Sequence, residues 1–576
     1  MRPNLLAGVL ALLLALPALS EEETATLPTG VEIDLGPAGA VTLRRYEHDA
    51  VAVEVDGSLD ESVWSELPVA SDFRVLEPDT LAVPPYRTAL RFFYTEHGLY
   101  LGFDLEQPPD TIVRRYVPRD NLDIKRDNVS FTLDTSGNGR YGYWMNVSLG
   151  DSQRDGTILP ERQYSTEWDG AWYGASAGTA RGWSAEVFIP WSQVAMPKEP
   201  GLRRMAFYTQ REVAHRNEIW GFPALPESQS QFMSSFQPLI LEGIDPRQQW
   251  SVFPYASSSF DRVDDDLRYK AGLDLFWRPT SNFQLTATAN PDFGSVESDD
   301  VVVNLTANET FFPEKRLFFQ EGQEIFQATP RSEIEGDQRF SVVNTRRIGG
   351  RPDDPDLPPG TSLPARDALA VADLLGAAKA TGQYGGFRYG VLAAFEDETA
   401  FRIDDAEYLV DGREFGTVRL LYEDSRGAAY RGLGFLSTAV LRPDAEAFVH
   451  SADLHYLSRG GRWKFDGQLV HSERDDLGGG NGATADFTFT PRQGLKHQLQ
   501  MAWFDERLNV NDLGFQIRND NRDVWYRMEW VRSGLSRVRD FKLTPFLRYE
   551  ENGDGYRTNN AVASGYEITL NNLHTL

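Results

Sequence analysis

Apolar and polar residues alternate along much of the second half of the chain. In residues 270–277, for example, Ala271, Leu273, Leu275 and Trp277 occupy every second position. The same period recurs in residues 283–290, 463–469, 498–503, 524–530 and 542–549. This alternation predicts strands with two unlike faces, each about ten residues long, the length that a tilted membrane-crossing strand requires. A soluble all-β domain with one solvated face would alternate in the same way.

Shorter strands are predicted between residues 51 and 243. They are expected at residues 88–94, 99–105, 128–134, 143–149, 172–177, 183–189 and 204–212. Gly, Asp, Asn or Pro interrupts most of the gaps, and many short strands with turn signals predict a β-sandwich. Trp183 is expected in its core, and Glu186, on the opposite face of the same strand, is expected in solvent. The predicted fold class is all-β: an N-terminal sandwich over 51–243, then an antiparallel outer-membrane-type β-barrel over 249–576.

The N-terminus has the features of a secretory signal peptide over residues 1–20. Arg2 supplies the positive start, Leu5 to Leu16 the apolar run, and Ala18-Leu19-Ser20 a cleavage site. Residues 21–50 are acidic and rich in Gly and Pro, which indicates a linker. The signal peptide, together with strand length and number, favours the barrel over a soluble domain.

Charge and cysteine content narrow the functional classes. The formal net charge is −28, which argues against nucleic acid as a partner, because that partner needs a basic face. The chain has no cysteine, so disulfides, thiol catalysis and Cys-ligated zinc are excluded. An exported protein that lacks cysteine is consistent with a location in the bacterial envelope.

One long connection interrupts the alternating strands at residues 290–322, with the sequence NPDFGSVESDDVVVNLTANETFFPEKRLFFQEG. Its length and polarity suggest a loop folded into the barrel lumen. We expect its phenylalanine pairs, at 311–312 and 318–319, to lie against the barrel wall, and Lys315 and Arg316 to pair with acidic residues. Such a loop either sets gating and ligand contact or serves as a structural brace.

Several of these segments resemble known families. VDGSLDESVW (55–64), LYLGF (99–103), RDNVSFTLD (126–134) and GWSAEVFIP (182–190) resemble the carbohydrate-binding family 9 modules. The 290–322 segment resembles an outer-membrane β-barrel domain of unassigned function, DUF5916, as do the following stretches: TRRIG (345–349), LGAAKATG (375–382), DLGF (512–515) and RND (518–520). The final residues, 571–576, lack the aromatic end of such barrels, so we expect either a fragment or a different closure.

The family 9 resemblance implies a sugar site on the sandwich. Sugars stack on aromatic faces, while amides and charged groups bind their hydroxyls. The candidate platforms are Trp144, Trp168, Trp172 and Trp220, and the candidate polar partners are Asp127, Asn146, Asp155, Asp169 and Arg211. The alternative is that these tryptophans fill the sandwich core.

Two acidic loops are candidate Ca²⁺ sites. Asp134 and Asn138 belong to one, and Asp151 and Asp155 to the other, each with hard oxygen ligands around glycines. The alternative is an Asx-rich turn in each place.

These features predict a protein of the bacterial outer membrane that binds carbohydrate. Its sandwich would lie in the periplasm or the barrel lumen, and the pair of domains would capture glycans or pass them on in carbohydrate catabolism. The expected partners are an oligo- or polysaccharide and outer-membrane lipid, with Ca²⁺ as the candidate ion. Two alternatives remain: a hydrolase of O-glycosyl bonds, although we find no catalytic set, and an envelope protein whose sandwich has lost sugar binding.

Overall fold

The computed structural model describes residues 39–121, 124–166, 168–197, 201–244, 249–261, 266–292, 308–333, 339–364, 367, 370–403, 406–425, 429–443 and 445–576. The predicted signal peptide and residues 293–307 of the long connection lie outside these ranges. Among the described helices, none has the length and apolar character needed to cross a membrane.

Two sheets form the N-terminal domain. The first has nine strands: β1 (Val41–Thr42), β13 (Gln237–Glu242), β11 (Leu202–Val213), β5 (Asn128–Asp134), β6 (Gly142–Ser148), β7 (Gln153–Leu159) and β8 (Gln163–Ser165) in order, with β12 (Glu218–Phe222) and β2 (Arg74–Glu77) branching from β11. The second has four: β3 (Thr88–Tyr94), β4 (Gly98–Glu106), β10 (Gly182–Pro190) and β9 (Tyr173–Thr179). Among the pairs of named strands in the described part of this domain, β1–β13 is the parallel one.

The connections between these strands contain short helices. They are η1 (His48–Ala50), α2 (Ser62–Glu66), η2 (Pro109–Thr111), η3 (Ala214–Arg216) and η4 (Met233–Ser235).

A shared core holds the two sheets together, as expected of a sandwich. Phe92 of β3 meets Phe207 of β11 with ring centroids 5.1 Å apart, and Phe131 of β5 stacks on Phe207 at 5.5 Å. Trp183 is fully buried in this core, as predicted. Glu186 was predicted to lie in solvent, and this prediction was wrong. The residue is only 1% exposed, because the chain around Asp56 and Gly57 covers that face of β10.

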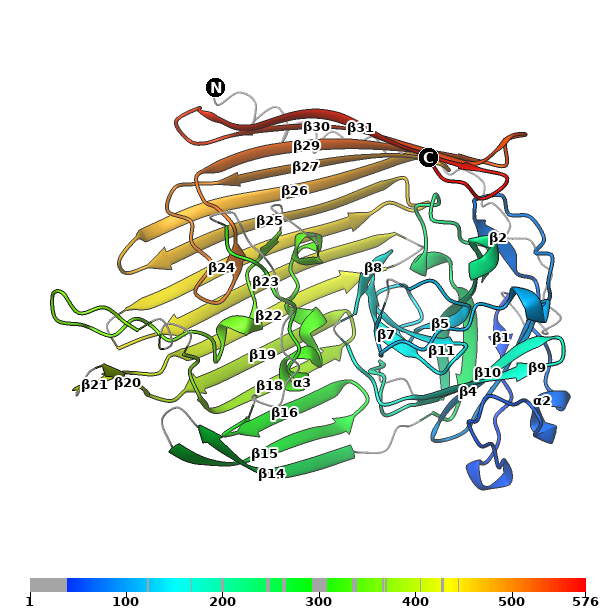
Figure 1. Ribbon diagram of the computed structural model, residues 1–576, viewed down its shortest axis with the longest axis horizontal. Helices are drawn as coiled ribbons and strands as arrows, with labels where there is room; N and C mark the ends of the chain where they lie inside the picture. The colour runs from blue at the N-terminus through cyan, green and yellow to red at the C-terminus, as the bar shows by residue number, and fades with distance from the viewer. Residues whose placement is uncertain are drawn as a thin grey trace. The chain divides into compact units, whose positions relative to one another are not determined.

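Fourteen antiparallel strands form one sheet in the second half of the chain. Their spatial order is their order in the sequence, as the run of colour from green to red in Figure 1 makes plain. The strands are β14 (Gln249–Asp261), β15 (Asp266–Thr280), β16 (Phe283–Ala289), β18 (Leu374–Tyr384), β19 (Phe387–Glu396), β22 (Glu414–Asp424), β23 (Tyr430–Leu441), β24 (Glu446–Leu457), β25 (Trp463–Arg474), β26 (Gly478–Arg492), β27 (Leu495–Phe504), β29 (Asn521–Ser533), β30 (Val538–Glu551) and β31 (Arg557–Leu570). Within the described ranges, no pairing joins β31 to β14, so the sheet is not seen to close.

The two faces of this sheet differ in chemistry because the residues alternate. Along β19, Phe387, Val391 and Phe395 are exposed on one face, while Arg388 and Glu396 are buried on the other. The apolar exposed face continues across the neighbouring strands through Val418, Leu420, Tyr422, Leu433, Phe435, Leu454, Leu469, Trp503, Val524, Leu547, Tyr549, Val562 and Tyr566. We call this the outer face and the opposite one the inner face.

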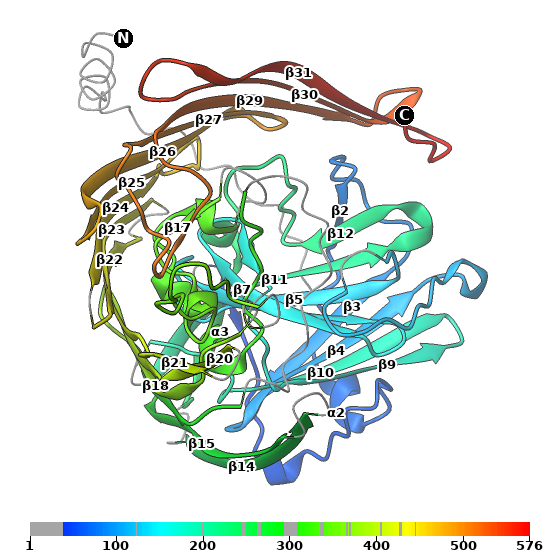
Figure 2. The same ribbon diagram turned by 60° about the vertical axis from the view of Figure 1, so that its left-hand side comes forward.

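The connection between β16 and β18 packs on the inner face. It contains α3 (Leu317–Gln320), η6 (Gln323–Phe326), η7 (Pro330–Glu333), β17 (Phe340–Ser341) and η8 (Thr345–Arg347). Phe318, Phe319 and Phe326 share an apolar core with Leu392 and Leu436 of the sheet, which confirms the expected position of the second phenylalanine pair. Figure 2 shows α3 and β17 on the concave side of the sheet.

Two small ribbons complete the described part of this half. β17 pairs with β28 (Phe515–Gln516), and β20 (Thr399–Ile403) pairs with β21 (Ala406–Val410) in a hairpin between β19 and β22.

Candidate functional site

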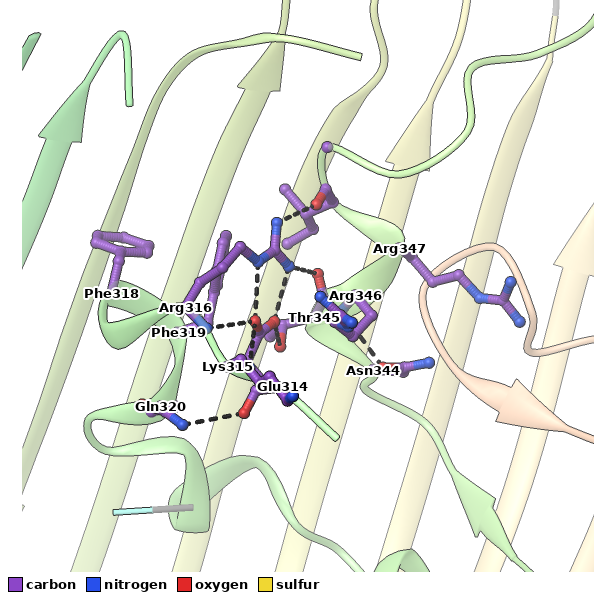
Figure 3. Close-up of polar contacts among 12 residues, drawn as sticks. Glu314, Lys315, Arg316, Phe318, Phe319, Gln320, Asn344, Thr345, Arg346 and Arg347 are labelled. Atoms are coloured by element: carbon purple, nitrogen blue, oxygen red, sulfur yellow. Dashed lines mark hydrogen bonds and ion pairs between the residues drawn. The ribbon is translucent and has the colours of Figure 1, made fainter. Parts of the chain in front are cut away.

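A buried ion pair organises the segment on the inner face. Arg316 donates from Nε and Nη2 to the two carboxylate oxygens of Glu314 at 2.8 and 2.7 Å, as Figure 3 shows. The same guanidinium donates to the carbonyl oxygens of Ile348 at 2.6 Å and Thr345 at 2.7 Å, and the Thr345 hydroxyl donates to Glu314 at 2.7 Å. The guanidinium carbon lies 4.3 Å from the ring centroid of Phe319. Arg316 therefore pairs with an acid, as predicted, and the acid belongs to its own motif.

Three stretches far apart in the sequence converge on this pair. The backbone amide of Asn344 donates to the carbonyl of Leu513 at 2.6 Å, and Arg347 donates to that of Gly514 at 3.1 Å. The rings of Phe311 and Phe515 meet edge to face at 5.1 Å. We call residues 308–322, 340–349 and 510–516, with these contacts, the hub.

The hub is fastened to the sheet at two levels. Lys379 of β18 donates to the carbonyl oxygens of Phe318 and Phe319 at 2.6 and 3.2 Å. The carboxylate of Glu396 in β19 accepts from the Gly349 amide at 2.9 Å and also pairs with Arg413. Buried charges with several partners of this kind fix one position of the hub, since each would be costly to leave unpaired.

A chain of alternating charges crosses the inner face beside the hub. Arg419 binds both oxygens of Asp453 and donates to the carbonyl of Ile325 at 3.2 Å. His455 lies between Asp453 at 2.8 Å and Asp466 at 2.7 Å, and Lys464 lies 3.5 Å from Asp466. We call these five residues the charge chain.

A small cavity of about 50 Å³ lies along the charge chain. Its lining includes Arg388, Glu423 and His455 from the sheet, Glu324 from η6, and the turn between β7 and β8 of the sandwich around Glu161. Sites for small organic ligands usually have volumes of 300 Å³ or more, whereas this one has space for water only. This cavity is therefore too small for a sugar.

The four predicted tryptophans are all buried in the sandwich. Three give their indole N–H to the protein: Trp144 to the carbonyl of Ser165 at 3.3 Å, Trp172 to Asp155 at 3.0 Å and Trp220 to Glu218 at 2.7 Å. Trp168 packs against Tyr143 at a centroid distance of 4.8 Å. None is more than 9% exposed, so in this conformation they act as core.

The predicted polar partners separate into three places. Asn146 lies between Asn128, to which it donates at 2.7 Å, and Arg154. Asp169 forms an ion pair with Arg119 at 2.6 Å. Asp127 and Arg211 come together with Trp220 in one cluster.

Gln107 links Asp127 to Arg211 in that cluster. Its side-chain nitrogen donates to Asp127 at 3.0 Å, and its oxygen accepts from Arg211 at 2.9 Å. Trp220 lies under the guanidinium at 5.1 Å. Burial lowers the pKa of Arg211 to about 10, with nearby carboxylates, first Asp127, opposing the shift. Arg211 remains charged at neutral pH, so the cluster has a fixed cation beneath its surface.

Two half-buried rings lie over this cluster, and sequence reasoning did not select either as a ligand. Tyr86 stacks on His215 at 6.0 Å and lies 5.9 Å from Trp220. The His215 ring contacts Gln107 at 3.3 Å, and burial lowers its pKa while Asp127 opposes the shift. We call Tyr86, His215, Gln107, Asp127 and Arg211 the arginine cluster.

Both candidate Ca²⁺ loops are closed by backbone amides. Asp134 accepts from the amides of Ser136, Gly137 and Gly139 at 2.9, 3.0 and 2.7 Å, while Asn138 accepts from the Ser136 hydroxyl at 2.8 Å. Burial raises the pKa of Asp134 to about 6.

The carboxylates of the second loop are likewise occupied by hydrogen bonds within the protein. Asp151 accepts from the Ser176 amide at 2.7 Å, and Asp155 accepts from Gly170, Trp172 and Arg119 at 2.8 to 3.0 Å. Burial also raises the pKa of Asp155 to about 6. Across the described residues, no group of three or more His, Asp or Glu side chains is placed to hold a metal. The contacts in both loops have the pattern of Asx turns, and Ca²⁺ binding by these residues stays a prediction.

Residues 246–572 match the family described as "Domain of unknown function (DUF5916)", over more than half of the chain. The chain belongs to this family. The match covers every strand of the large sheet, from β14 to β31, together with the hub and the charge chain. No curated protein matches the sequence.

Solved structures similar to this DUF5916 chain are distant. A carbohydrate-binding module of family 9 from Caldicellulosiruptor kristjanssonii, in complex with cellotriose, has 14% identity and a TM-score of 0.26, over 35% of this chain and 94% of that one. The anion-selective porin from Comamonas acidovorans has 12% identity and a TM-score of 0.25, over 76% of this chain and 91% of that one. OccAB1 from Acinetobacter baumannii has 8% identity and a TM-score of 0.26, over 76% and 93%.

The charge chain of this DUF5916 protein was missed in the sequence. Asp453 and His455 are two positions apart on one strand, and Lys464 and Asp466 are two apart on the next, so each pair lies on one face. Charged residues repeating at every second position in otherwise apolar strands were the available signal.

Proposed function

We propose that this protein lies in the outer membrane and passes polar solutes along the inner face of its fourteen-stranded sheet. One observation carries the proposal: the outer face is apolar and exposed over neighbouring strands, whereas the inner face is lined with buried charges. A sheet with this polarity is the inverse of a soluble sheet, whose exposed face is polar. Lipid is the partner that such an outer face fits.

Two further features of the outer face support the same placement. Leaving apolar surface in water costs about 25 cal/mol per Å², and side chains such as Leu420 and Leu469 are 52% and 66% exposed. Trp463, Phe489, His497 and Tyr526 stack in a row on the outer face, with centroid distances of 3.9, 6.1 and 6.2 Å. Aromatic rows near strand ends are typical of the lipid–water interface in membrane barrels.

The hub and the charge chain would then be the barrier that a solute must pass. The charge chain and residues 324–330, in the same connection as the hub, line a cavity of only about 50 Å³. Passage would therefore require this connection, which the hub's buried ion pairs hold in place, to move. Because cations and anions alternate in the charge chain, the barrier does not select one sign of charge. Neutral polar solutes, sugars among them, are the class that this lining suits.

The membrane part of the proposal is tested by an outer-face substitution. Leu420→Arg places a cation toward lipid in the middle of β22, which costs about 2–4 kcal/mol at the bilayer centre. We expect less heat-modifiable protein in the outer-membrane fraction. Tyr116→Arg, at a sandwich position that is 73% exposed, is the control and should leave that amount unchanged. Full assembly of Leu420→Arg, or recovery of the unmodified protein in the soluble fraction, would contradict the proposal.

The transport part needs a flux measurement. Purified protein is reconstituted in liposomes and swelling is followed in glucose, cello-oligosaccharides and an uncharged polyol. Swelling faster than in empty liposomes supports passage. No swelling, both for the unmodified protein and for a variant with a released hub such as Arg316→Met, would contradict it.

Sugar binding by the sandwich is a second candidate, supported by the arginine cluster. There a half-buried tyrosine lies above an arginine, an amide and a carboxylate, the side-chain types that hold a sugar ring and its hydroxyls. The test is a titration of the full chain with a glycan array, followed by tryptophan fluorescence, since Trp220 lies beneath the cluster. Saturable quenching that Tyr86→Ala abolishes and Tyr116→Ala retains would support it. No response to any glycan would leave the sandwich without a sugar role, and release of reducing ends would instead favour the hydrolase.

A further inference from the structure

The long connections between sheet strands all lie at one edge of the sheet, where four short connections, 262–265, 442–445, 475–477 and 552–556, lie as well. The three long connections are 290–373 with the hub, 397–413 with the β20–β21 hairpin, and 505–520. At the opposite edge the connections are 281–282, 385–386, 425–429, 458–462, 493–494 and 534–537, none longer than five residues. We call the edge with the long connections the long edge and the opposite one the short edge.

The sandwich contacts the short edge at several separate points within the unit Val31–Leu576. At the β18–β19 turn, Gln383 donates to the Tyr141 hydroxyl at 2.6 Å and Arg140 donates to the carbonyl of Gly385 at 3.3 Å. Toward β14, the amide of Met196 donates to the carbonyl of Ser281 at 3.1 Å.

The contacts continue along the later strands of the same edge. Gln493, in the β26–β27 turn, donates to both oxygens of Asp79 at 2.9 and 3.0 Å. Arg539, at the start of β30, donates to Glu218 at 3.0 Å and to the carbonyl of Arg216 at 2.7 Å. Gly461 lies so close to the sandwich that a Cβ there would meet Gln231 at 2.5 Å.

These contacts have the character of a specific interface. The side chains of Glu218 and Arg539 are 8% and 14% exposed, so their ion pair is largely shielded from water. This shielding strengthens the attraction between the two charges. Glu218 also binds Arg216 at 3.0 Å and Trp220 at 2.7 Å, which ties the interface to the arginine cluster.

One element of the sandwich reaches past the edge to the inner face. The turn between β7 and β8, residues 159–163, lines the cavity together with Tyr430, His455 and Lys464. Glu161 in this turn accepts from the Ser234 amide at 3.2 Å and is 5% exposed, so the turn is held in shape by the sandwich. The turn thus lies against the inner face near the short edge.

We infer that the short edge is the periplasmic end of the sheet, and that the sandwich is a periplasmic module docked there which closes this end with its β7–β8 turn. Outer-membrane barrels have short turns on the periplasmic side and longer loops outside the cell. The β20–β21 hairpin and the 505–520 loop then face the cell exterior. The inference rests on the proposed function, because it presumes that the sheet lies in the outer membrane.

The absence of cysteine makes a direct test available. Single cysteines are placed in the sandwich at Tyr173 or Leu202, which are 60% and 58% exposed, and at the long edge at Leu409 or Tyr556, which are 57% and 72% exposed. Intact cells and cells with a permeabilised outer membrane are treated with a membrane-impermeant maleimide. Only outer-membrane, heat-modifiable protein is scored, so that unfolded variants do not count.

We expect Leu409→Cys and Tyr556→Cys to be labelled on intact cells, and Tyr173→Cys and Leu202→Cys only after permeabilisation. Labelling of a sandwich position on intact cells would overturn the inference, as would protection of both long-edge positions. A chain found outside the outer-membrane fraction would overturn the proposed function as well, whereas reversed labelling of outer-membrane protein overturns the inference alone.

Docking is tested in the same background with two cysteines. In Asp79→Cys/Gln493→Cys, a short bis-maleimide should join the sandwich to the β26–β27 turn and change the gel mobility of the chain. Tyr173→Cys/Gln493→Cys is the matched pair without a docking contact and should give no such product. Equal products from both pairs, or none from the first, would contradict the docked position.

Discussion

The buried carboxyl group of Glu186 holds the first segment of the sandwich against one of its strands. It accepts from the amides of Asp56 and Gly57 at 3.0 Å each and from the Trp64 indole at 2.9 Å, which pins the entry segment of the domain onto β10. Gly57 has φ +91°, and a Cβ there would lie 2.5 Å from the backbone of Ser176, so only glycine fits this approach. The anchor is thus a carboxyl group whose charged form is disfavoured by burial.

The pH dependence of sandwich stability should reflect this carboxylate. Burial, followed by the charge of Glu61, raises the pKa of Glu186 to about 7. A raised carboxyl pKa means that the folded state holds the proton more tightly, so the stability from this group is present below about pH 4.5 and is lost as the pH rises through about 7. Thermal unfolding of Glu186→Gln should show a smaller fall of Tm over this range, whereas the exposed Glu66→Gln should keep the slope of the unmodified protein. Equal slopes in all three proteins would contradict the assignment.

On the inner face, the fully buried pair of Arg419 and Asp453 should behave as a unit. Arg419→Met leaves Asp453 with His455 alone and should cost about 3–5 kcal/mol, because an uncompensated buried charge remains. Arg419→Met/Asp453→Leu removes both charges and should recover most of that loss. Unfolding in detergent, followed by tryptophan fluorescence, measures the coupling, and additive effects of the two single changes would refute it.

Among the elements, the hub is where a local change should alter passage through the sheet. Arg316→Met leaves the buried Glu314 with the Thr345 hydroxyl and two backbone amides, at a local cost of about 3–5 kcal/mol. We expect the hub to loosen and single-channel conductance in planar bilayers to rise. Arg351→Met removes an exposed ion pair with Asp354 and should leave conductance unchanged. If both variants conduct like the unmodified protein, the hub is a brace and does not control passage.

For the whole molecule, docking of the sandwich should couple the unfolding of its two halves. Arg539→Met removes a hydrogen-bonded ion pair to Glu218 and should weaken docking by about 1.5–3 kcal/mol. Calorimetry should then show the sandwich unfolding at a lower temperature, separately from the sheet. Arg522→Met is the control, because it removes a partly exposed ion pair with Glu551 on the neighbouring strand of the sheet. The temperature at which the sandwich unfolds should then stay unchanged. An unchanged profile for Arg539→Met would show that this contact contributes little to docking.

The sequence by itself determined what depends on local pattern. Alternation of period two placed the strands of the large sheet and gave them one apolar and one polar face, because successive side chains of a strand always point to opposite sides. The same alternation placed Trp183 in the core. The run of Phe, Glu, Lys and Arg at 311–319 marked the hub segment, since paired aromatics and charges in one connection require buried partners.

Tertiary structure decided which faces are covered and which distant residues meet. Glu186 appeared solvated because its own strand cannot show that residues 56–64, more than a hundred positions away, lie over it. The tryptophans could not be assigned to core or ligand for the same reason. Convergence of Glu314, Thr345 and Leu513 in the hub, and of Asp79 with Gln493 at the short edge, arises from chain topology, which brings together groups that no local spacing relates.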